Sequence, residues 1–191
     1  MVRAILKEQK VEIPEEVTVT LKSKIITVKG IKGELSRSFK SMPVQINEIK
    51  TGNRLSGLNI RVWFAKAKPS SCINTIATHI RNMITGVSKG FKYTMKFGYK
   101  LHPMQPVATE GGKGIKVNNY LGRKFIPHIP AQPGVIISTA NAEGKKEIEL
   151  EGISPEALGI TSSQITQKNK PFDKDRRVFR DGIFIQKREV L

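Results

Sequence analysis

Histidine and cysteine are the residue types in this 191-residue chain whose chemistry is easiest to recognise from spacing. His79, His102 and His128 stand far apart, and none has a second His or a Cys at the spacing of a metal site. No order of Ser, His and Asp indicates a nucleophile elbow, so the sequence does not support acyl transfer. Cys72 is the single cysteine, which excludes a disulfide framework and a cysteine-based zinc site. We expect Cys72 to be a small buried residue of a helix.

Two further stretches contain residue types that occur in phosphate-binding or metal-binding sites. Residues 111–114 (GGKG) resemble a phosphate-binding loop, but no Ser or Thr follows the Lys and a strand is predicted next. We therefore predict a hairpin tip. Asp173, Asp175 and Asp181 alternate with Lys and Arg, which would neutralise a Mg²⁺ site, and Asp181-Gly182 has the pattern of a tight hairpin turn. The sequence predicts no metal, no cofactor, no small-molecule substrate and no enzymatic activity.

The dominant feature is positive charge. The chain has 33 Lys and Arg against 16 Asp and Glu, a formal net charge of +17. Counted along the sequence, residues 1–90 carry 16 basic and 6 acidic side chains, and residues 91–191 carry 17 and 10, so both halves are basic. A folded surface with this charge repels itself and favours a polyanionic partner, of which nucleic acid is the commonest because its phosphates release counterions on binding.

An anionic membrane is the alternative partner for such a surface. No apolar run approaches the ~20 residues of a membrane span, and the N-terminal residues have no long apolar segment typical of a secretory signal. We expect a cytosolic or nuclear protein without a membrane partner.

The first half shows period-two alternation of apolar residues. Residues 17–21 and 25–29 alternate on either side of Ser23-Lys24, which predicts a hairpin with one buried face, and residues 34–40 begin another strand. Residues 44–49 and 55–63 predict a second hairpin with its bend at 51–53.

A helix is predicted after these strands, over residues 71–89. Pro69 and the serines that follow it provide an N-terminal signal with a Ser cap, and Gly90 a stop. One apolar stripe at helical spacing comprises Ile73, Ile76, Ala77, Ile80, Met83, Ile84 and Val87.

The second half repeats this arrangement. Strands are predicted at 91–101, 107–109, 115–117, 135–139 and 147–151. A second helix follows, with Ser154 as its cap, Pro155 at its first position, and Leu158 and Ile165 one heptad apart. Each half places an Ile-Pro pair before a hairpin and one amphipathic helix after it. We predict an α+β fold of two similar domains, residues 1–88 and 89–191, each a mainly antiparallel sheet packed with one helix.

The basic residues are densest near the C-terminus, where they are interleaved with Phe172, Phe179 and Phe184. In contrast, Glu147, Glu149 and Glu151 alternate with apolar residues and so share one face of a strand, which we expect to turn away from phosphate. The residues that we predict to contact RNA are Lys96, Lys100, Arg123, Lys124, Lys168, Lys170, Lys174, Arg176, Arg177, Arg180, Lys187 and Arg188.

Several motifs also carry a family resemblance. Residues 174–188 (KDRRVFRDGIFIQKR) resemble the C-terminal motif of the universal ribosomal protein six family of the large subunit, in its eukaryotic and archaeal branch. Residues 11–19 (VEIPEEVTV) and 28–35 (VKGIKGEL) resemble the family's opening and first hairpin. Residues 79–93 (HIRNMITGVSKGFKY) are similar to its central helix and next strand, and residues 119–124 (NYLGRK) to a loop of its second domain.

This resemblance implies a structural component of the large ribosomal subunit that binds large-subunit ribosomal RNA near the stalk base and the sarcin–ricin loop. It implies neighbouring large-subunit proteins as further partners, a cytoplasmic location on the ribosome, and assembly in the nucleus if the source is eukaryotic. The C-terminal basic motif of the second domain would then supply much of the RNA contact. A free-standing RNA-binding module or RNA chaperone of the same fold is the alternative.

Overall fold

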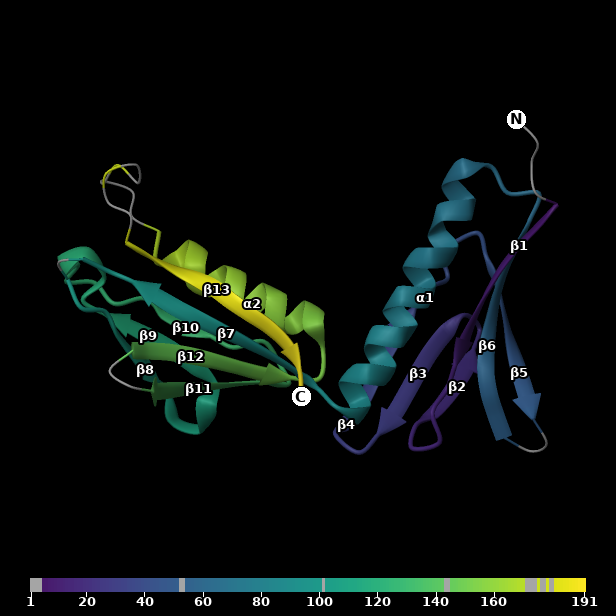
Figure 1. Cartoon of the computed structure of the whole chain (residues 1–191), viewed down its shortest axis with the longest axis horizontal. Helices are drawn as coiled ribbons and strands as arrows, with labels where there is room; N and C mark the ends of the chain where they lie inside the picture. The colour runs from purple at the N-terminus through teal and green to yellow at the C-terminus, as the bar shows by residue number, and fades with distance from the viewer. Residues whose placement is uncertain are drawn as a thin grey trace. The chain divides into compact units, whose positions relative to one another are not determined.

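The chain folds as two compact units, Met1–Lys89 and Gly90–Leu191, in the computed structural model. The structure describes residues 5–51, 54–100, 102–142, 145–170, 175, 178 and 181–191. Each described unit contains two antiparallel sheets and one α-helix, so the predicted α+β class is confirmed (Figure 1).

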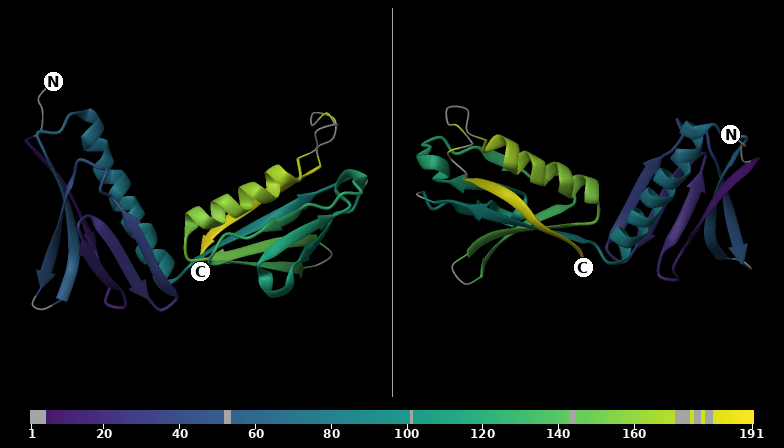
Figure 2. Two further views of the ribbon diagram at one scale, coloured as in Figure 1. Left: turned by 180° about the vertical axis from the view of Figure 1, so that it is seen from behind. Right: turned by 45° about the horizontal axis from the view of Figure 1, so that its top comes forward.

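The first unit has six strands before its helix: β1 (Leu6–Glu12), β2 (Thr18–Lys22), β3 (Ile25–Gly30), β4 (Gly33–Ser38), β5 (Gln45–Thr51) and β6 (Arg54–Trp63). They form two sheets of order β1-β6-β5 and β2-β3-β4. Helix α1 (Ala67–Ser88) packs against β1, β3, β4 and β6, so it contacts both sheets (Figure 2).

The turns of the first unit follow from its sequence. The predicted hairpin between β2 and β3 is confirmed, with Ser23 and Lys24 both at positive φ (50° and 62°), as a two-residue turn requires. The β5–β6 pairing is confirmed as well; Gly52 and Asn53 at its predicted bend lie outside the described residues.

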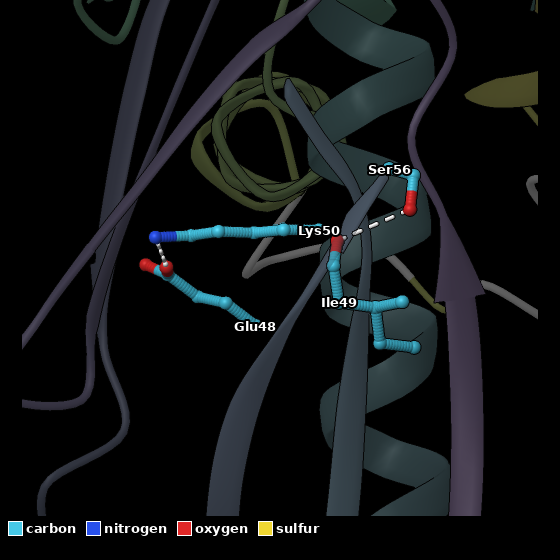
Figure 3. A network of polar contacts seen from close by, with 4 residues as sticks. All are labelled: Glu48, Ile49, Lys50 and Ser56. Carbon is cyan, nitrogen blue, oxygen red and sulfur yellow. Dashed lines mark hydrogen bonds and ion pairs between the residues drawn. The ribbon is translucent and has the colours of Figure 1, made fainter. Parts of the chain in front are cut away.

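A β-bulge between Ile49 and Lys50 shifts the register of β5 against β6. Ser56 Oγ donates to the Ile49 carbonyl over 3.1 Å, and Lys50 Nζ lies 3.2 Å from Glu48 Oε2 (Figure 3). The hydroxyl thus supplies a partner for a carbonyl at the irregular step, where the ladder is locally disrupted.

Helix α1 confirms the predicted apolar stripe, all seven members of which are buried. Its predicted start is wrong by four residues. Lys66 is the N-cap, no side chain caps the helix, and Ser71 Oγ donates to the Lys68 carbonyl instead. Pro69 lies inside the first turn, where its missing N–H is harmless because first-turn amides have no acceptor within the helix. Cys72 is only partly buried, which corrects the expectation of a buried thiol.

The second unit contains β7 (Phe91–Gly98), β8 (Gln105–Ala108), β9 (Gly114–Asn118), β10 (His128–Pro130), β11 (Val135–Ala142), β12 (Lys145–Gly152) and β13 (Gly182–Val190). The sheets have the orders β11-β12-β7-β13 and β10-β9-β8. Two 3₁₀ turns, η1 (Glu110–Gly112) and η2 (Tyr120–Gly122), flank β9. The predicted hairpin tip at 111–114 is confirmed, because β8 and β9 pair across it.

Helix α2 (Pro155–Lys168) covers one face of the four-stranded sheet. Its predicted cap is confirmed, since Ser154 Oγ accepts from the Ala157 N–H (3.4 Å). Leu158 and Ile165 are fully buried, and they share one core with Met95 of β7, Ile148 of β12 and Ile129 of β10.

The predicted turn at Asp181-Gly182 is wrong. Gly182 is the first residue of β13, and β13 pairs with β7, where Gly182 stands opposite Gly98. The expected partner strand includes Arg177 and Phe179, which lie outside the described residues. The small Gly98-Gly182 pair instead gives room to the ring of Phe184, because a methyl group on Gly182 would lie 2.7 Å from the ring.

Candidate nucleic-acid interface

The twelve residues predicted to contact RNA fall into three groups in the structure. Lys174, Arg176, Arg177 and Arg180 lie outside the described residues and stay a prediction. A second group surrounds one end of the second unit. A third group, Lys96, Lys187 and Arg188, lies along β7 and β13.

Lys168 and Lys170 are placed by the C-terminal end of α2. Asn169 between them is buried, and its Nδ2 donates to the Ile165 carbonyl (2.8 Å), which satisfies an end group of the helix. The Lys170 N–H donates to the Gln167 carbonyl (3.1 Å). Because the residue between them is held inward, both lysine side chains extend into solvent.

Arg123 and Lys124 follow η2, in a loop of unusual backbone geometry. Asn119, Leu121 and Gly122 all have positive φ (58°, 50° and 70°), and the Arg123 N–H donates to the Tyr120 carbonyl (3.0 Å). Asn and Gly adopt this conformation readily, whereas a Leu does so at a cost. The loop is therefore held in a specific shape, with Lys124 exposed.

Hydrogen bonds connect these two basic segments through the start of β13. Tyr120 is buried, and its Oη donates to the Asp181 carbonyl (3.2 Å), so η2 lies against the residue before β13. From the other side, Thr166 Oγ1 of α2 donates to the Ser162 carbonyl of its own helix (3.1 Å) and also lies 3.4 Å from the Ile183 carbonyl oxygen, so α2 contacts the start of β13. The end of α2 and the loop after η2 thus meet at the point where β13 begins.

The end of β7 lies at the same place. Gly98 pairs with Gly182, and Lys100 follows two residues later. The next residues return to η2, because Asn119 Nδ2 donates to the Pro103 carbonyl (3.3 Å). Figures 1 and 2 show the end of β7, the end of α2 and the start of β13 at one end of this unit. We name this region the basic end; its described cations are Lys100, Arg123, Lys124, Lys168 and Lys170.

Lys96 and Lys187 have a different setting. Both lie on the sheet face that also carries Glu147, Glu149 and Glu151, since Lys96 stands opposite Glu147 in the register. The sequence predicted that this acidic face turns away from phosphate, and it contains two of the predicted RNA ligands. The carboxylates lower the positive potential around Lys96 and Lys187, which makes them weaker phosphate ligands than the basic end.

Lys92 on this face belongs to the protein's own structure. Its Nζ lies 2.8 Å from Glu149 Oε2 and 3.7 Å from Glu151 Oε1. The hydrogen bond to Glu149 raises the pKa of Lys92 above 10.5, against a smaller opposing effect of desolvation. Arg188, in turn, lies over the Tyr93 ring, 5.5 Å from the ring centroid, in cation–π geometry.

The arrangement of the basic end is suited to binding phosphate. Exposed Lys and Arg on a rigid support can contact a polyanion with little loss of conformational freedom. Among the residues that the structure describes, no group of three or more His, Cys, Asp or Glu is placed to hold a metal ion. No helix in the described part of the chain is long and apolar enough to cross a membrane.

Two positioning features escaped sequence reasoning. Tyr120 orders the basic end through a hydrogen bond to a residue 61 positions away, which no local pattern indicates. The second is the pairing of Gly98 with Gly182, on which the Phe184 ring lies; that ring is 53% exposed, and the buried side chain beside it is Ile183.

Comparison with known proteins identifies the family. A family model described as Ribosomal protein L6 matches residues 13–90. A Tetrahymena thermophila protein named large ribosomal subunit protein uL6 is 34% identical over 188 residues, covering 98% of this chain and 97% of its own length. The chain belongs to the uL6 family of large ribosomal subunit proteins.

The uL6 relatives come from archaea as well as eukaryotes. The uL6 protein of Ignicoccus hospitalis is 34% identical over 192 residues and covers 100% of both chains. The uL6B protein of Saccharomyces cerevisiae is 37% identical over 183 residues, 95% of this chain and 93% of its own. Membership in uL6 makes this chain a structural component of the large ribosomal subunit, not an enzyme, and places it on the ribosome with ribosomal RNA and proteins as partners.

Proposed function

We propose that this uL6 chain is anchored to large-subunit ribosomal RNA by the basic end of its second unit, near the stalk base and the sarcin–ricin loop. The observation that carries the proposal is the convergence of four separate segments, the ends of β7 and α2, the loop after η2 and the start of β13. Five described cations gather there, and the chain between Lys170 and Asp181 adds Lys174, Arg176, Arg177 and Arg180 in sequence.

The mechanism is electrostatic attachment to a structured RNA. Each phosphate neutralised by Lys or Arg releases condensed counterions, which favours binding in low salt. Guanidinium groups add two parallel hydrogen bonds to a phosphate. Tyr120 and Asn169 hold the basic segments in place before RNA arrives, so less conformational entropy is lost on binding.

A charge-removal experiment tests this proposal. One variant replaces Arg123, Lys124, Lys168 and Lys170 by Ala; the matched control replaces four exposed lysines of the first unit, Lys10, Lys22, Lys32 and Lys40. Affinity for a large-subunit RNA fragment is measured against salt. We expect the basic-end variant to bind more weakly and to show a smaller salt slope, by roughly 0.7–0.9 for each phosphate that the variant no longer neutralises.

The control variant should keep most of its affinity for the RNA fragment, because in this proposal the position of the cations, and not the total charge of the chain, determines binding. Circular dichroism of both variants should match that of the natural chain. Equal losses of affinity in the two variants would refute the basic end as the anchor. A slope near zero in the natural chain would refute electrostatic attachment altogether.

A further inference from the structure

An exposed apolar tip stands at the end of the β1–β6 pair in the first unit. The Phe64 N–H donates to the Ile5 carbonyl (2.9 Å), which extends the pairing one step beyond Leu6 and Trp63. Ile5, Trp63 and Phe64 are 64%, 51% and 68% exposed. Three large apolar residues exposed at one end of a strand pair make a candidate binding surface, whereas a single exposed one does not.

The backbone at this tip is strained. Phe64 has a φ of 47°, in the left-handed region that a bulky side chain rarely occupies. Such a conformation costs energy and persists only where the surroundings impose it, and it is concentrated at functional sites. In this conformation the ring of Phe64 is exposed to solvent.

Trp63 and Phe64 lie in a stretch of sequence without acidic residues. The 61 residues between Glu48 and Glu110 include no Asp or Glu. The Lys and Arg residues of that stretch are Lys50, Arg54, Arg61, Lys66, Lys68, Arg81, Lys89, Lys92, Lys96 and Lys100. Of these cations, Lys50, Arg61 and Lys92 are paired with carboxylates and Lys96 stands opposite Glu147, so the positive potential near the tip comes from Lys66 and Lys68.

Two of these lysines are next to the tip. Lys66 and Lys68 are exposed at the beginning of α1, whose first turn has no acidic residue. Lysines at that end of a helix oppose its dipole, so they are stabilised when an anion binds there. The nearest carboxylate on the neighbouring strand, Glu8, is already neutralised by Arg61, whose Nε lies 3.0 Å from Glu8 Oε2.

We propose that this tip is a second contact with ribosomal RNA, at which an unpaired base stacks on Trp63 while Lys66 and Lys68 bind the flanking phosphates. Exposed aromatic rings beside cations are the means by which proteins bind unstacked RNA bases. A protein partner would have to bring acidic groups to the lysines, and the ribosome's most abundant anion is phosphate. The inference rests on the RNA partner of the proposed function but not on the basic end.

Trp63 is the one tryptophan of the chain, so the tryptophan fluorescence of the protein reports on the tip alone. The full-length protein is titrated with a ten-residue oligoadenylate and, separately, with polyphosphate of equal charge. Binding is followed twice, by anisotropy of a label on the added polyanion and by Trp63 fluorescence. We expect oligoadenylate to quench Trp63 through base stacking, and polyphosphate to bind without quenching.

Two substitutions complete the test. Trp63→Leu keeps an apolar side chain without a ring and should weaken oligoadenylate binding roughly 5- to 150-fold, as expected for loss of one stacked base. Trp63→Phe should restore most of the affinity. The basic-end variant described above should still show quenching of Trp63 by oligoadenylate, even if its binding to the ribosomal RNA fragment is lost.

Three outcomes would overturn the proposal: oligoadenylate that binds without changing Trp63 emission, polyphosphate that quenches equally, or full affinity in Trp63→Leu. Any of them would leave the tip as a surface for a protein. If oligoadenylate quenches Trp63 in the natural chain but not in the basic-end variant, then oligoadenylate binding depends on the basic end. That result would also refute the tip as an independent site. None of these results bears on whether the basic end anchors the ribosomal RNA fragment.

Discussion

The two helices of this chain occupy similar places in their units but are stabilised differently. Helix α1 has 22 residues, no side-chain cap and a continuous aliphatic stripe in the core. Helix α2 has 14 residues, a Ser154 cap, and buried Thr161, Ser162 and Asn169 beside its apolar residues. Side-chain hydrogen bonds join α1 to its neighbours as well, from Lys7 Nζ to Ser70 Oγ (2.8 Å) and between Arg37 and His79 (3.1 Å), but α1 lacks the N-cap bond of α2.

The difference relates to what each helix positions. The polar residues of α2 bond to defined partners: Thr161 Oγ1 to the Ala157 carbonyl, Thr166 Oγ1 to the Ser162 carbonyl, and Asn169 Nδ2 to the Ile165 carbonyl. These bonds lie within α2 and order its C-terminal end, from which Lys168 and Lys170 of the basic end extend; Thr166 Oγ1 also lies 3.4 Å from the Ile183 carbonyl oxygen of β13. Apolar contacts alone, which are not directional, would leave that geometry less well defined.

The largest expected effect is a loss of stability when a buried side chain of α1 is truncated. Ile80 is fully buried, so Ile80→Ala should lower the free energy of unfolding by about 2–5 kcal/mol through lost burial and a cavity. Urea unfolding followed by circular dichroism measures it. Asn74→Ala, at an exposed position of the same helix, is the matched control and should change stability by less than about 0.5 kcal/mol. A destabilisation well under the lower end of that range for Ile80→Ala would contradict the view that burial holds α1.

The next prediction concerns the N-terminal caps of the two helices, where two substitutions should change stability in opposite directions. Ser154→Ala removes the cap of α2 and should destabilise by about 1 kcal/mol. Lys66→Asp adds a cap where α1 has none and removes a charge that opposes the helix dipole, so it should stabilise by about 0.5–2 kcal/mol. Thermal or urea unfolding of the two variants against the natural chain gives both signs directly.

Lys66→Asp also tests whether Lys66 contributes to RNA binding, because the substitution should raise stability and lower affinity. If Lys66 binds RNA phosphate, the stabilised variant should bind oligoadenylate more weakly, a gain in stability at the expense of function. Destabilisation by Lys66→Asp, or stabilisation together with unchanged oligoadenylate binding, would contradict this account of why α1 has a lysine at its cap.

The sequence predicted the elements better than their ends or the site. Alternation at 17–29 and the stripe of α1 were correct because each reports burial of one face, which is a property of neighbouring residues. Ser154 was correctly predicted as a cap because its spacing to Ala157 is local. The start of α1 was wrong because Pro69 was taken as a boundary, although the first turn tolerates it.

Assembly of the basic end could not be predicted from the same rules. It depends on the pairing of Gly182 with Gly98 and on the bond from Tyr120 to Asp181, contacts between residues 61 or more positions apart. The positive φ of Leu121 has no signal in its residue type. Lys96 and Lys187 show the converse: their residue types suit RNA, but the register places them beside glutamates.

The smallest expected effect is the stability contribution of Lys92, a lysine of the sheet that lies outside the basic end. If Lys92 is a structural lysine, its ion pair with Glu149 should contribute to stability, by less than about 1 kcal/mol for a partly exposed pair. The pKa of Lys92 is raised above 10.5 in the folded state. The contribution is therefore fully present below pH 10.5 and is lost as the pH rises through the folded pKa, because the folded protein then loses the proton that favoured it.

Lys92→Met should accordingly be less stable than the natural chain at pH values near 8, and the difference should shrink at pH values above 10.5. Urea unfolding of both proteins at each pH isolates Lys92, since the other titrating groups are common to both. Lys187→Met is the control, because its Nζ lies 3.7 Å from Glu189 and its side chain is 61% exposed, so its stability difference should be near zero at every pH. A Lys92→Met difference that stays constant to the highest pH would show that packing of its aliphatic stem, not its charge, is what Lys92 contributes.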